Sequence, residues 1–278
     1  MRRLLFAALA SSAVLSNAQD TWSVAELLDR AGRYVRKFEQ DLSVVIADES
    51  YQQLVTSAVA NGALASRRTK AEFAFIDVPD EHKWIVLRNV VEVNGRAVAD
   101  RRGRIEAILR GSASGRQSRI QALADDSARY NIGGLYRNFN DPTLAALFLD
   151  PEAQGRFLFW QDGSETIDGV KTVRLAYREM QTPTAIRRGD VDLFSSGKVW
   201  VDESGRIVRT TLRVTDSERG VTGNVMVTFR VDPRLGFLVP YRMDEAYLQV
   251  SGQRITSVAT YSNVRRFETS SRIVEPKQ

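Results

Sequence analysis

The second half of the chain consists almost entirely of strand-forming runs separated by turn residues. Between Arg156 and Phe267, stretches rich in valine, threonine and aromatic residues are separated by glycine, aspartate or proline, at intervals of roughly ten to fifteen residues that favour strands joined by hairpins. In one stretch, Val173, Leu175 and Tyr177 alternate with polar residues, as in an antiparallel strand with one face in water. The pattern predicts a single large twisted antiparallel sheet or an open barrel.

The first half begins with an amphipathic helix and continues with more strands. Ser23 and Glu26 form a capping-box pattern, and apolar residues recur behind it at helical spacing, which predicts a helix over residues 24–41. We expect this helix to pack on the core of the domain; the alternative is a helix on a membrane surface. Strand patterns follow at 42–55, 70–78, 83–93 and 96–100, with a hairpin signal at Asn94-Gly95.

The middle of the chain has helical periodicity. Apolar residues recur at helical spacing in residues 104–109 and 116–130, and a proline opens a short apolar helix over residues 142–149. Residues 101–153 are therefore expected to form a helical insertion between two groups of strands. Helices and an antiparallel sheet in separate stretches of the chain predict an α+β fold.

The N-terminus has the parts of an export signal. Arg2 and Arg3 precede an apolar run over residues 4–15, and small residues then lead to an expected cleavage site. The alternative is a buried N-terminal core helix. We expect residues 1–18 to be a signal peptide and residues 19–278 to form a single domain.

Nothing after this signal predicts a membrane anchor. No cysteine follows it, so we do not expect a lipoprotein. No later stretch is apolar over the length of about eighteen residues that a membrane-spanning helix needs. The mature protein is expected to be soluble, in the periplasm or outside the cell.

The residue inventory excludes most catalytic and metal-binding chemistry. The chain has no cysteine and one histidine, His82, which rules out thiol nucleophiles, cysteine-based zinc sites and HExxH metal sites. His82 lies in a charged turn, and no GxSxG nucleophile elbow is present. The stretch Asp190-Val191-Asp192 resembles the start of a calcium loop but lacks the glycine and the closing glutamate. We expect no catalytic residues, no metal and no cofactor.

Three pairs of neighbouring carboxylates are the remaining candidates for hydrolysis. Glycoside cleavage needs two carboxyl groups that face each other across the scissile bond, whereas neighbours in a strand point to opposite faces. At most one of Asp48 and Glu49 therefore points inward, and we interpret all three pairs as solvated charge. A secreted carboxylate-dependent hydrolase is therefore the least supported function. The pairs are Asp48-Glu49, Asp125-Asp126 and Asp244-Glu245.

The net positive charge is small and dispersed. The formal net charge of +5 falls to +3 when Arg2 and Arg3 leave with the signal peptide. The basic residues are grouped in pairs and not in long runs, so we do not expect nucleic-acid binding. Weak attraction to an anionic membrane surface is the second interpretation.

Several predicted strands are apolar on both faces. Residues 73–76, 84–87 and 157–160 carry apolar side chains at consecutive positions, whereas a sheet with water on one side should alternate. Helices that cover the second face explain this pattern. A sheet that curves around an apolar cavity for an acyl chain or similar ligand explains it as well.

One hairpin and the last strand carry short motifs. Residues 197–209 read GKVWVDESGRIVR, and residues 261–267 read YSNVRRF. Together with the N-terminal helix, the antiparallel sheet and the helical insertion, they resemble the outer-membrane lipoprotein carrier and its relatives among exported bacterial proteins. In those proteins a strand ending in W-x-D leads through a glycine turn into a second strand. The resemblance covers most of residues 24–267 and implies an unclosed half-barrel with a helical lid that binds lipid or acyl chains without catalysis.

We therefore expect an exported, non-catalytic binding or carrier protein for a lipid-like or other hydrophobic ligand, acting as a monomer. The alternative is a cell-envelope interaction or sensor protein that uses the surface or edge of its sheet to bind envelope proteins. Apolar residues of the strands and of the lid are the candidates that line the cavity. They are Trp84, Val86, Trp160, Trp200 and Phe229 in the strands, and Leu144, Leu147 and Phe148 in the lid.

Overall fold

A computed structural model describes most of the chain that follows the predicted signal peptide. The described residues are 22–42, 45–59, 62–78, 83–101, 103–111, 115–135, 137 and 139–266. Residues 1–18 and His82 lie outside them, so the prediction of a signal peptide stays a prediction.

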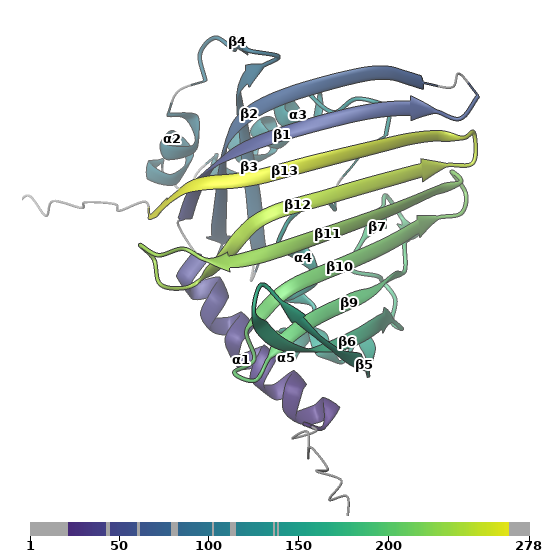
Figure 1. The fold of residues 1–278 in the computed structure, drawn as a ribbon. Helices are drawn as coiled ribbons and strands as arrows, with labels where there is room; N and C mark the ends of the chain where they lie inside the picture. Colours follow the sequence, from purple (N-terminus) through teal and green to yellow (C-terminus); the bar gives the residue numbers. More distant parts are fainter. Residues whose placement is uncertain are drawn as a thin grey trace, which may run out of the picture.

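Eleven antiparallel strands form one open sheet, as the sequence predicts (Figure 1). Their order is β4-β3-β2-β1-β13-β12-β11-β10-β9-β6-β5. The last strand, β13, returns to pair with the first, β1, while β4 and β5 stand at opposite ends of the order. The sheet is therefore not closed into a barrel. Its strands are β1 (Val45–Ser57), β2 (Gly62–Val78), β3 (Lys83–Val93), β4 (Arg96–Ala97), β5 (Phe157–Ile167), β6 (Val170–Glu179), β9 (Ser195–Asp202), β10 (Ile207–Asp216), β11 (Val221–Val231), β12 (Leu238–Gln249) and β13 (Gln253–Arg266).

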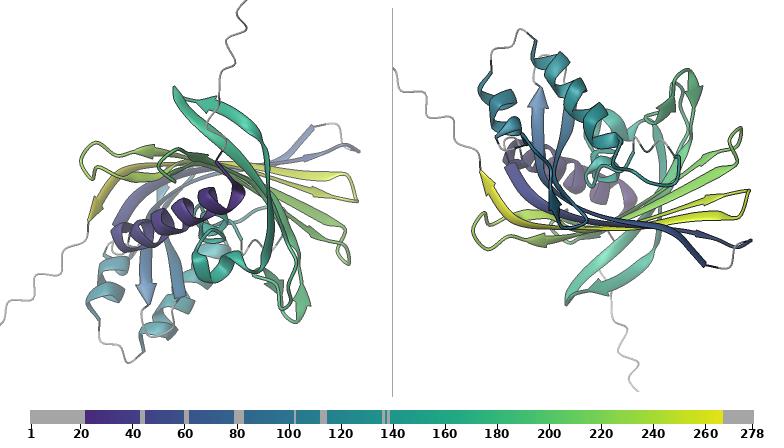
Figure 2. Two further views of the ribbon diagram at one scale, coloured as in Figure 1. Left: turned by 90° about the horizontal axis from the view of Figure 1, so that it is seen from below. Right: turned by 90° about the horizontal axis from the view of Figure 1, so that it is seen from above.

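Helix α1 (Val24–Leu42) begins with the predicted capping box and packs against the sheet. The Glu26 carboxylate accepts hydrogen bonds from Ser23 N (2.8 Å) and Ser23 Oγ (2.7 Å). The sheet curves around this helix (Figure 2), and we call the face toward it the inner face. The predicted packing of the helix on the core is confirmed. Its buried stripe consists of Leu27, Ala31, Val35 and Phe38.

The helical insertion divides between the two faces of the sheet. Helices α2 (Arg104–Arg110) and α3 (Arg116–Ala128) pack on the outer face of β1 to β3, whereas α4 (Leu144–Leu147) and α5 (Pro151–Gln154) lie on the side of α1. Strands β2 and β3 are apolar on both faces because helices cover both. The outer cluster consists of Ile46, Ala74, Leu87, Ile105, Ile108, Ile120 and Leu123.

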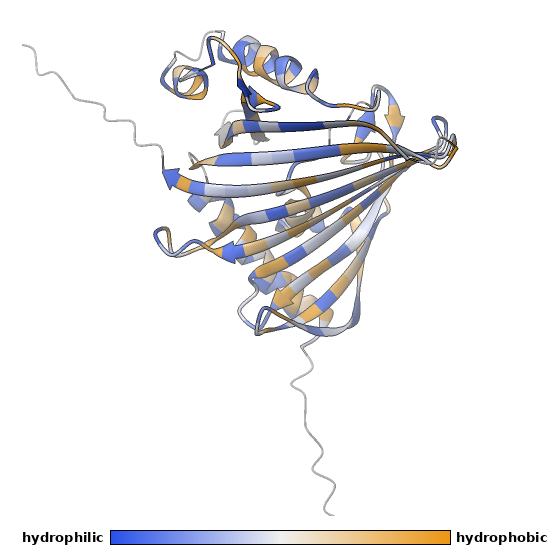
Figure 3. Ribbon diagram, turned by 45° about the horizontal axis from the view of Figure 1, so that its top comes forward, coloured by the Kyte–Doolittle hydropathy of each residue, from blue (hydrophilic) through white to orange (hydrophobic). Residues whose placement is uncertain are grey.

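Hydrophobic and hydrophilic residues alternate along the middle strands of the sheet (Figure 3). In β11, for example, Val225, Val227 and Phe229 are buried, whereas Asn224 and Met226, which have the opposite parity, are exposed. This alternation is typical of antiparallel strands with one face in water. A separate small hairpin, β7 (Arg187–Arg188) and β8 (Val191–Asp192), stands apart from the sheet.

The hairpin between β9 and β10 shows why its W-x-D-x-x-G motif matters. Asp202 Oδ1 accepts hydrogen bonds from Ser204 N (2.9 Å) and Arg206 N (2.9 Å), and its Oδ2 accepts one from Arg206 Nε (2.7 Å). Gly205 has φ +89°, and a Cβ at this position would lie 2.6 Å from the backbone of Arg30. The aspartate organises the turn, and the glycine lets the turn approach α1.

We expect Asp202→Asn to lower the free energy of unfolding by about 1.5–3 kcal/mol at pH 7, the range for hydrogen bonds to a charged group. Burial alone would raise the pKa of Asp202, but hydrogen bonds from Ser204 and Arg206 hold it below the usual value of 3.8. A lowered carboxyl pKa stabilises the fold above the unfolded-state pKa, and this stabilisation is lost as the pH falls. The difference from the natural protein should therefore shrink in urea titrations below about pH 4. Glu203→Gln, at the exposed neighbouring position, is the matched control; a difference that grows on acidification would contradict this assignment.

Candidate ligand-binding site

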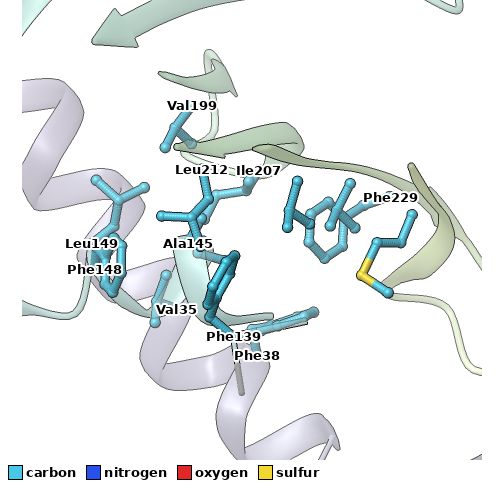
Figure 4. Packing of buried hydrophobic residues seen from close by; sticks show 14 of the residues in the cluster. Val35, Phe38, Phe139, Ala145, Phe148, Leu149, Val199, Ile207, Leu212 and Phe229 are labelled. Carbon is cyan, nitrogen blue, oxygen red and sulfur yellow. The ribbon is translucent and has the colours of Figure 1, made fainter. Parts of the chain in front are cut away.

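The inner face of the sheet is apolar, and the chain itself covers it. Residues 131–149, which we call the cover segment, connect α3 to α5; residues 136 and 138 of this segment lie outside the described part. The apolar side chains of the cover segment pack with α1 and the sheet in one main core (Figure 4). The cover residues in this core are Ile132, Leu135, Phe139, Leu144, Ala145, Ala146, Leu147, Phe148 and Leu149.

Two aromatic rings anchor the cover segment on the inner face. Phe148 stacks on Phe157 with ring centroids 4.5 Å apart and meets Tyr177 edge to face at 5.6 Å. Phe139 lies 5.8 Å from the ring of Tyr247, over Gly223, where a Cβ would lie 2.6 Å from its ring. Paired aromatic rings add stabilisation beyond their buried area, so these contacts hold the segment down.

A small apolar cavity remains between the cover segment and the sheet. Its volume is about 60 Å³, which is room for about two water molecules. Pockets for drug-sized ligands measure roughly 300–1,000 Å³. The inner face is therefore closed, and a chain-like ligand fits there only if the cover segment moves. The lining residues are Leu135, Phe139, Arg188, Leu193, Val214, Asp216, Arg219, Val221, Gly223 and Tyr247.

A polar latch lies beneath the cover segment, inside the otherwise apolar core. The guanidinium of Arg137 donates hydrogen bonds to Tyr51 Oη (2.9 Å), Gln53 Oε1 (2.6 Å) and Ser257 Oγ (3.2 Å). It also lies 3.8 Å from the Glu245 carboxylate, and neither side chain of this pair is exposed to solvent. Because Arg137 belongs to the cover segment and its partners to β1, β12 and β13, this latch ties the two together.

Strand register brings the latch partners to one place. Gln53 of β1 stands opposite Ser257 of β13, and Ser257 stands opposite Glu245 of β12. Tyr51 precedes Gln53 by two residues, and side chains two apart in a strand share a face. Gln53, Ser257 and Glu245 therefore lie side by side across three neighbouring strands, and we call them the polar row.

A second buried ion pair continues this polar row toward the edge of the sheet. Arg88 of β3 donates to both carboxylate oxygens of Glu49 of β1, with distances of 2.6 and 2.9 Å. The Glu49 side chain is fully buried and that of Arg88 nearly so. A bidentate arginine–carboxylate pair of this kind is among the strongest side-chain hydrogen-bond arrangements. Arg88 is thus committed to Glu49.

Burial dominates the electrostatics of the latch. It raises the pKa of Glu245 above the usual 4.5, while Arg137 and a hydrogen bond from Tyr247 act in the opposite direction. The Tyr247 hydroxyl donates to Glu245 Oε2 at 2.7 Å. Burial raises the pKa of Tyr247 well above its usual value, so the phenol stays neutral. The latch therefore pairs the Arg137 cation with a carboxyl group whose ionised form is disfavoured by burial.

The structure brings together some of the predicted lining residues and separates others. Val86, Leu144, Leu147, Phe148 and Phe229 all contribute to the main core on the inner face. The side chain of Trp84 lies outside the described part.

Two predicted residues, Trp160 and Trp200, lie on the outer face. Trp200 stands between Val199 and Val201, which point inward, and it packs with Ile167 of the β5–β6 hairpin in a separate small cluster. Trp160 is 44% exposed. Neither tryptophan is near the cover segment's core contacts.

The interpretation of the paired carboxylates as solvated charge is wrong for one member of each pair. Glu49 and Glu245 point inward and are buried, because they share a strand face with Tyr51 and Tyr247. Asp126 is largely buried as well, and its carboxylate meets Arg101 and two further arginines. Each of these carboxylates is held by arginine.

Neither a cluster of metal-ligating side chains nor a membrane-spanning helix is present among the described residues. Within that part of the chain, no group of three or more histidine, aspartate or glutamate side chains could hold a metal ion. Over the same residues, no helix has the length and apolar character needed to cross a membrane.

Comparison with known proteins finds similarity only in structure. No protein-family model matches the sequence, and no curated protein matches it either. A DUF1329 family protein from Desulfovibrio piger is 13% identical, with 88% of this chain and 94% of that chain covered and a TM-score of 0.42. A putative outer membrane lipoprotein-sorting protein domain from Vibrio parahaemolyticus is 11% identical, with 88% and 94% covered and a TM-score of 0.43.

A third solved structure is also similar to this chain. It is a LolA superfamily protein from Nitrosomonas europaea, 14% identical, with 92% of this chain and 99% of that chain covered and a TM-score of 0.34. The names of these proteins include the lipoprotein-carrier type that the sequence resembles. The likeness is one of fold type and says nothing about ligand or activity.

Proposed function

We propose that the protein is a non-catalytic carrier or binding protein for a lipid-like or other hydrophobic ligand. The ligand takes the place of the cover segment on the inner face of the sheet. The observation that carries this proposal is the pairing of a largely apolar, curved sheet face with a cover segment that contains little regular secondary structure. The regular structure within the cover segment is the four-residue helix α4.

The cover segment is attached to the sheet through Arg137, Phe139 and Phe148, but it contains little regular structure of its own. Segments with little regular structure belong to the least stable parts of a fold and open most easily. Displacement of this segment would expose the inner-face side chains that now contact Phe139 and Phe148. An acyl chain would restore the lost apolar contacts at about 25 cal/mol per Å² of buried surface.

The buried carboxylates support binding without catalysis. Glu49 is held bidentately by Arg88, and Glu245 lies beneath Arg137. Neither carboxylate is open to a substrate in this conformation, so these two carboxylates do not form an accessible acid–base pair while the cover segment is in place.

The proposed setting is the cell envelope. The N-terminal pattern of two arginines, an apolar run and small residues supports export. We propose that the mature chain works in the periplasm or outside the cell, where a sealed apolar site would shield a ligand from water.

Protein purified from its native envelope should carry a co-purified lipid or other apolar molecule. Solvent extraction followed by mass spectrometry detects it, and protein refolded from denaturant serves as the stripped control. A ligand-free preparation that also takes up no apolar probe would overturn the carrier proposal.

A second candidate function, interaction with an envelope protein, is supported by the edge strand β5. This strand ends the sheet and carries Leu158 and Trp160, which are 50% and 44% exposed. Free strand edges can accept another strand. Co-purification of a stoichiometric envelope protein, in place of lipid, would favour this second function.

A further inference from the structure

The place that Arg137 occupies has the chemistry of a cation-binding site. The surrounding groups are the Glu245 carboxylate, the hydroxyls of Tyr51 and Ser257, and the amide oxygen of Gln53. The guanidinium carbon also lies 5.4 Å from the ring centroid of Tyr247, within the range of cation–π attraction. Hydrogen-bond acceptors and one negative charge thus converge on a single cation.

Arg137 fills this site incompletely. Among the described residues, Glu245 Oε1 and Arg137 Nε have no hydrogen-bond partner although both are buried. The distance of 3.8 Å between Arg137 Nη1 and Glu245 Oε2 is also too long for a hydrogen bond. An unpaired oxygen on a buried carboxylate is costly, so a donor that reached Oε1 would fit the site better than Arg137 does.

Movement of the cover segment would leave a negatively charged site on the sheet. Arg137 would leave with the cover segment, whereas Glu245 and Tyr247 belong to β12 and would remain. Arg88, the neighbouring cation, donates from Nε and Nη2 to Glu49. On the exposed sheet, Glu245 would keep the hydrogen bond from Tyr247 but would lose Arg137, its nearest cation.

We propose that the hydrophobic ligand carries a cationic, hydrogen-bond-donating head group, such as a primary ammonium, that replaces Arg137 beside Glu245 and Tyr247. This inference rests on the proposed carrier function. The apolar part of the ligand lies on the inner face, and the head group completes the polar row. An anionic head group is disfavoured because it would meet the Glu245 carboxylate.

Three amphiphiles with the same chain test this assignment on the full mature protein. Dodecylamine, dodecanol and dodecanoate, each below its micelle concentration at pH 7, compete with the fluorescent probe N-phenyl-1-naphthylamine. We expect dodecylamine to bind about ten-fold more tightly than dodecanol, the factor that one charge-assisted hydrogen bond supplies. Dodecanoate should bind more weakly than dodecanol.

The variant Glu245→Gln should bring the ratio of amine to alcohol affinity within about two-fold, since the amide lacks the charge. The ratio is measured because the substitution also weakens the latch, and a weaker latch would change the affinities for the amine and for the alcohol by the same factor. Asp244→Asn is the matched control: Asp244 lies next to Glu245 in β12, points outward and is bonded by Arg242.

Two outcomes separate this assignment from the proposed function. Equal binding of the three amphiphiles, or an unchanged ratio in Glu245→Gln, would overturn the cationic head group and leave the carrier function standing. Binding of none of them, and of no probe, would overturn both.

Discussion

Replacement of Arg137 by methionine is expected to lower the free energy of unfolding by about 3–5 kcal/mol, the cost of leaving one member of a buried ion pair without its partner. Methionine keeps the apolar length of the side chain and removes its charge. Glu245, whose side chain is fully buried, would then lack a counter-charge. Urea unfolding followed by circular dichroism measures the loss.

The double variant Arg137→Met/Glu245→Met separates this effect from a loss of packing. Replacement of both partners of a buried ion pair by apolar residues is often neutral or stabilising. We expect the double variant to recover most of the stability that the single variant loses. A single variant within about 1 kcal/mol of the natural protein would show that the latch is not a buried ion pair.

The loss in Arg137→Met should also depend on pH in a defined direction. Burial raises the pKa of Glu245, and Arg137 opposes that shift, so the substitution raises this pKa further. A carboxyl group whose pKa is raised in the folded state lowers the free energy of unfolding as the pH rises from its unfolded-state pKa through its folded-state pKa. The single variant should therefore be closer to the natural protein at pH 5 than at pH 8.

The strand pattern of the sequence was sufficient to predict the sheet and its open form. Alternation at Val173, Leu175 and Tyr177 places these side chains on one face, and the structure has Leu175 and Tyr177 buried in the main core. The capping box at Ser23 and Glu26 likewise located the start of α1. Such features are local, so a single sequence carries them.

The face that an apolar residue occupies depends on tertiary contacts and was harder to predict. Trp200 is apolar, although Lys198 and Asp202 share its strand parity and Val199 and Val201 have the opposite parity. The choice is made by the β5–β6 hairpin, whose Ile167 covers the outer face at this point. In the same way, the positions of α2 and α3 on the outer face follow from packing on Ile46 and Leu87.

The sequence indicates that the polar residues of the sheet point inward, but it does not indicate that Arg137 of the cover segment is buried. Glu49 and Gln53 have the same parity as Tyr51 and Val55, which places all four on the inner face of β1. Charge alone favoured solvated carboxylates, and the parity was the stronger signal. Arg137 lies in a stretch without periodicity, and its burial follows from the distant partners Tyr51 and Glu245.

A disulfide between the cover segment and β13 should abolish ligand uptake, which is the second large effect expected. A Cβ added at Gly133 would lie 2.8 Å from Ile255 Cγ1, which is bonded to Ile255 Cβ, and this sets an upper limit on the Cβ–Cβ distance. The third-nearest atom to the added Cβ is 3.3 Å away, and Ile255 Cβ is not among the three nearest, which sets the lower limit. The Cβ atoms at positions 133 and 255 therefore lie about 3.3–4.3 Å apart, a separation that a disulfide spans. The chain has no cysteine of its own, so Gly133→Cys/Ile255→Cys gives one bond only.

The comparison between the oxidised and reduced forms of this variant is internally controlled. Gly133 has φ +90°, so a cysteine there is strained by about 1–2 kcal/mol, but the strain is the same in both forms. Ile255→Cys alone controls for the loss of the isoleucine side chain. Its binding should not respond to oxidant or reductant.

In the proposed carrier, the ligand occupies the inner face only after the cover segment has moved. Titration of the double-cysteine variant with N-phenyl-1-naphthylamine, before and after reduction, tests it most directly. We predict no fluorescence enhancement from the oxidised protein and recovery to the level of the natural protein on reduction. Equal probe binding by the oxidised and reduced forms would contradict the claim.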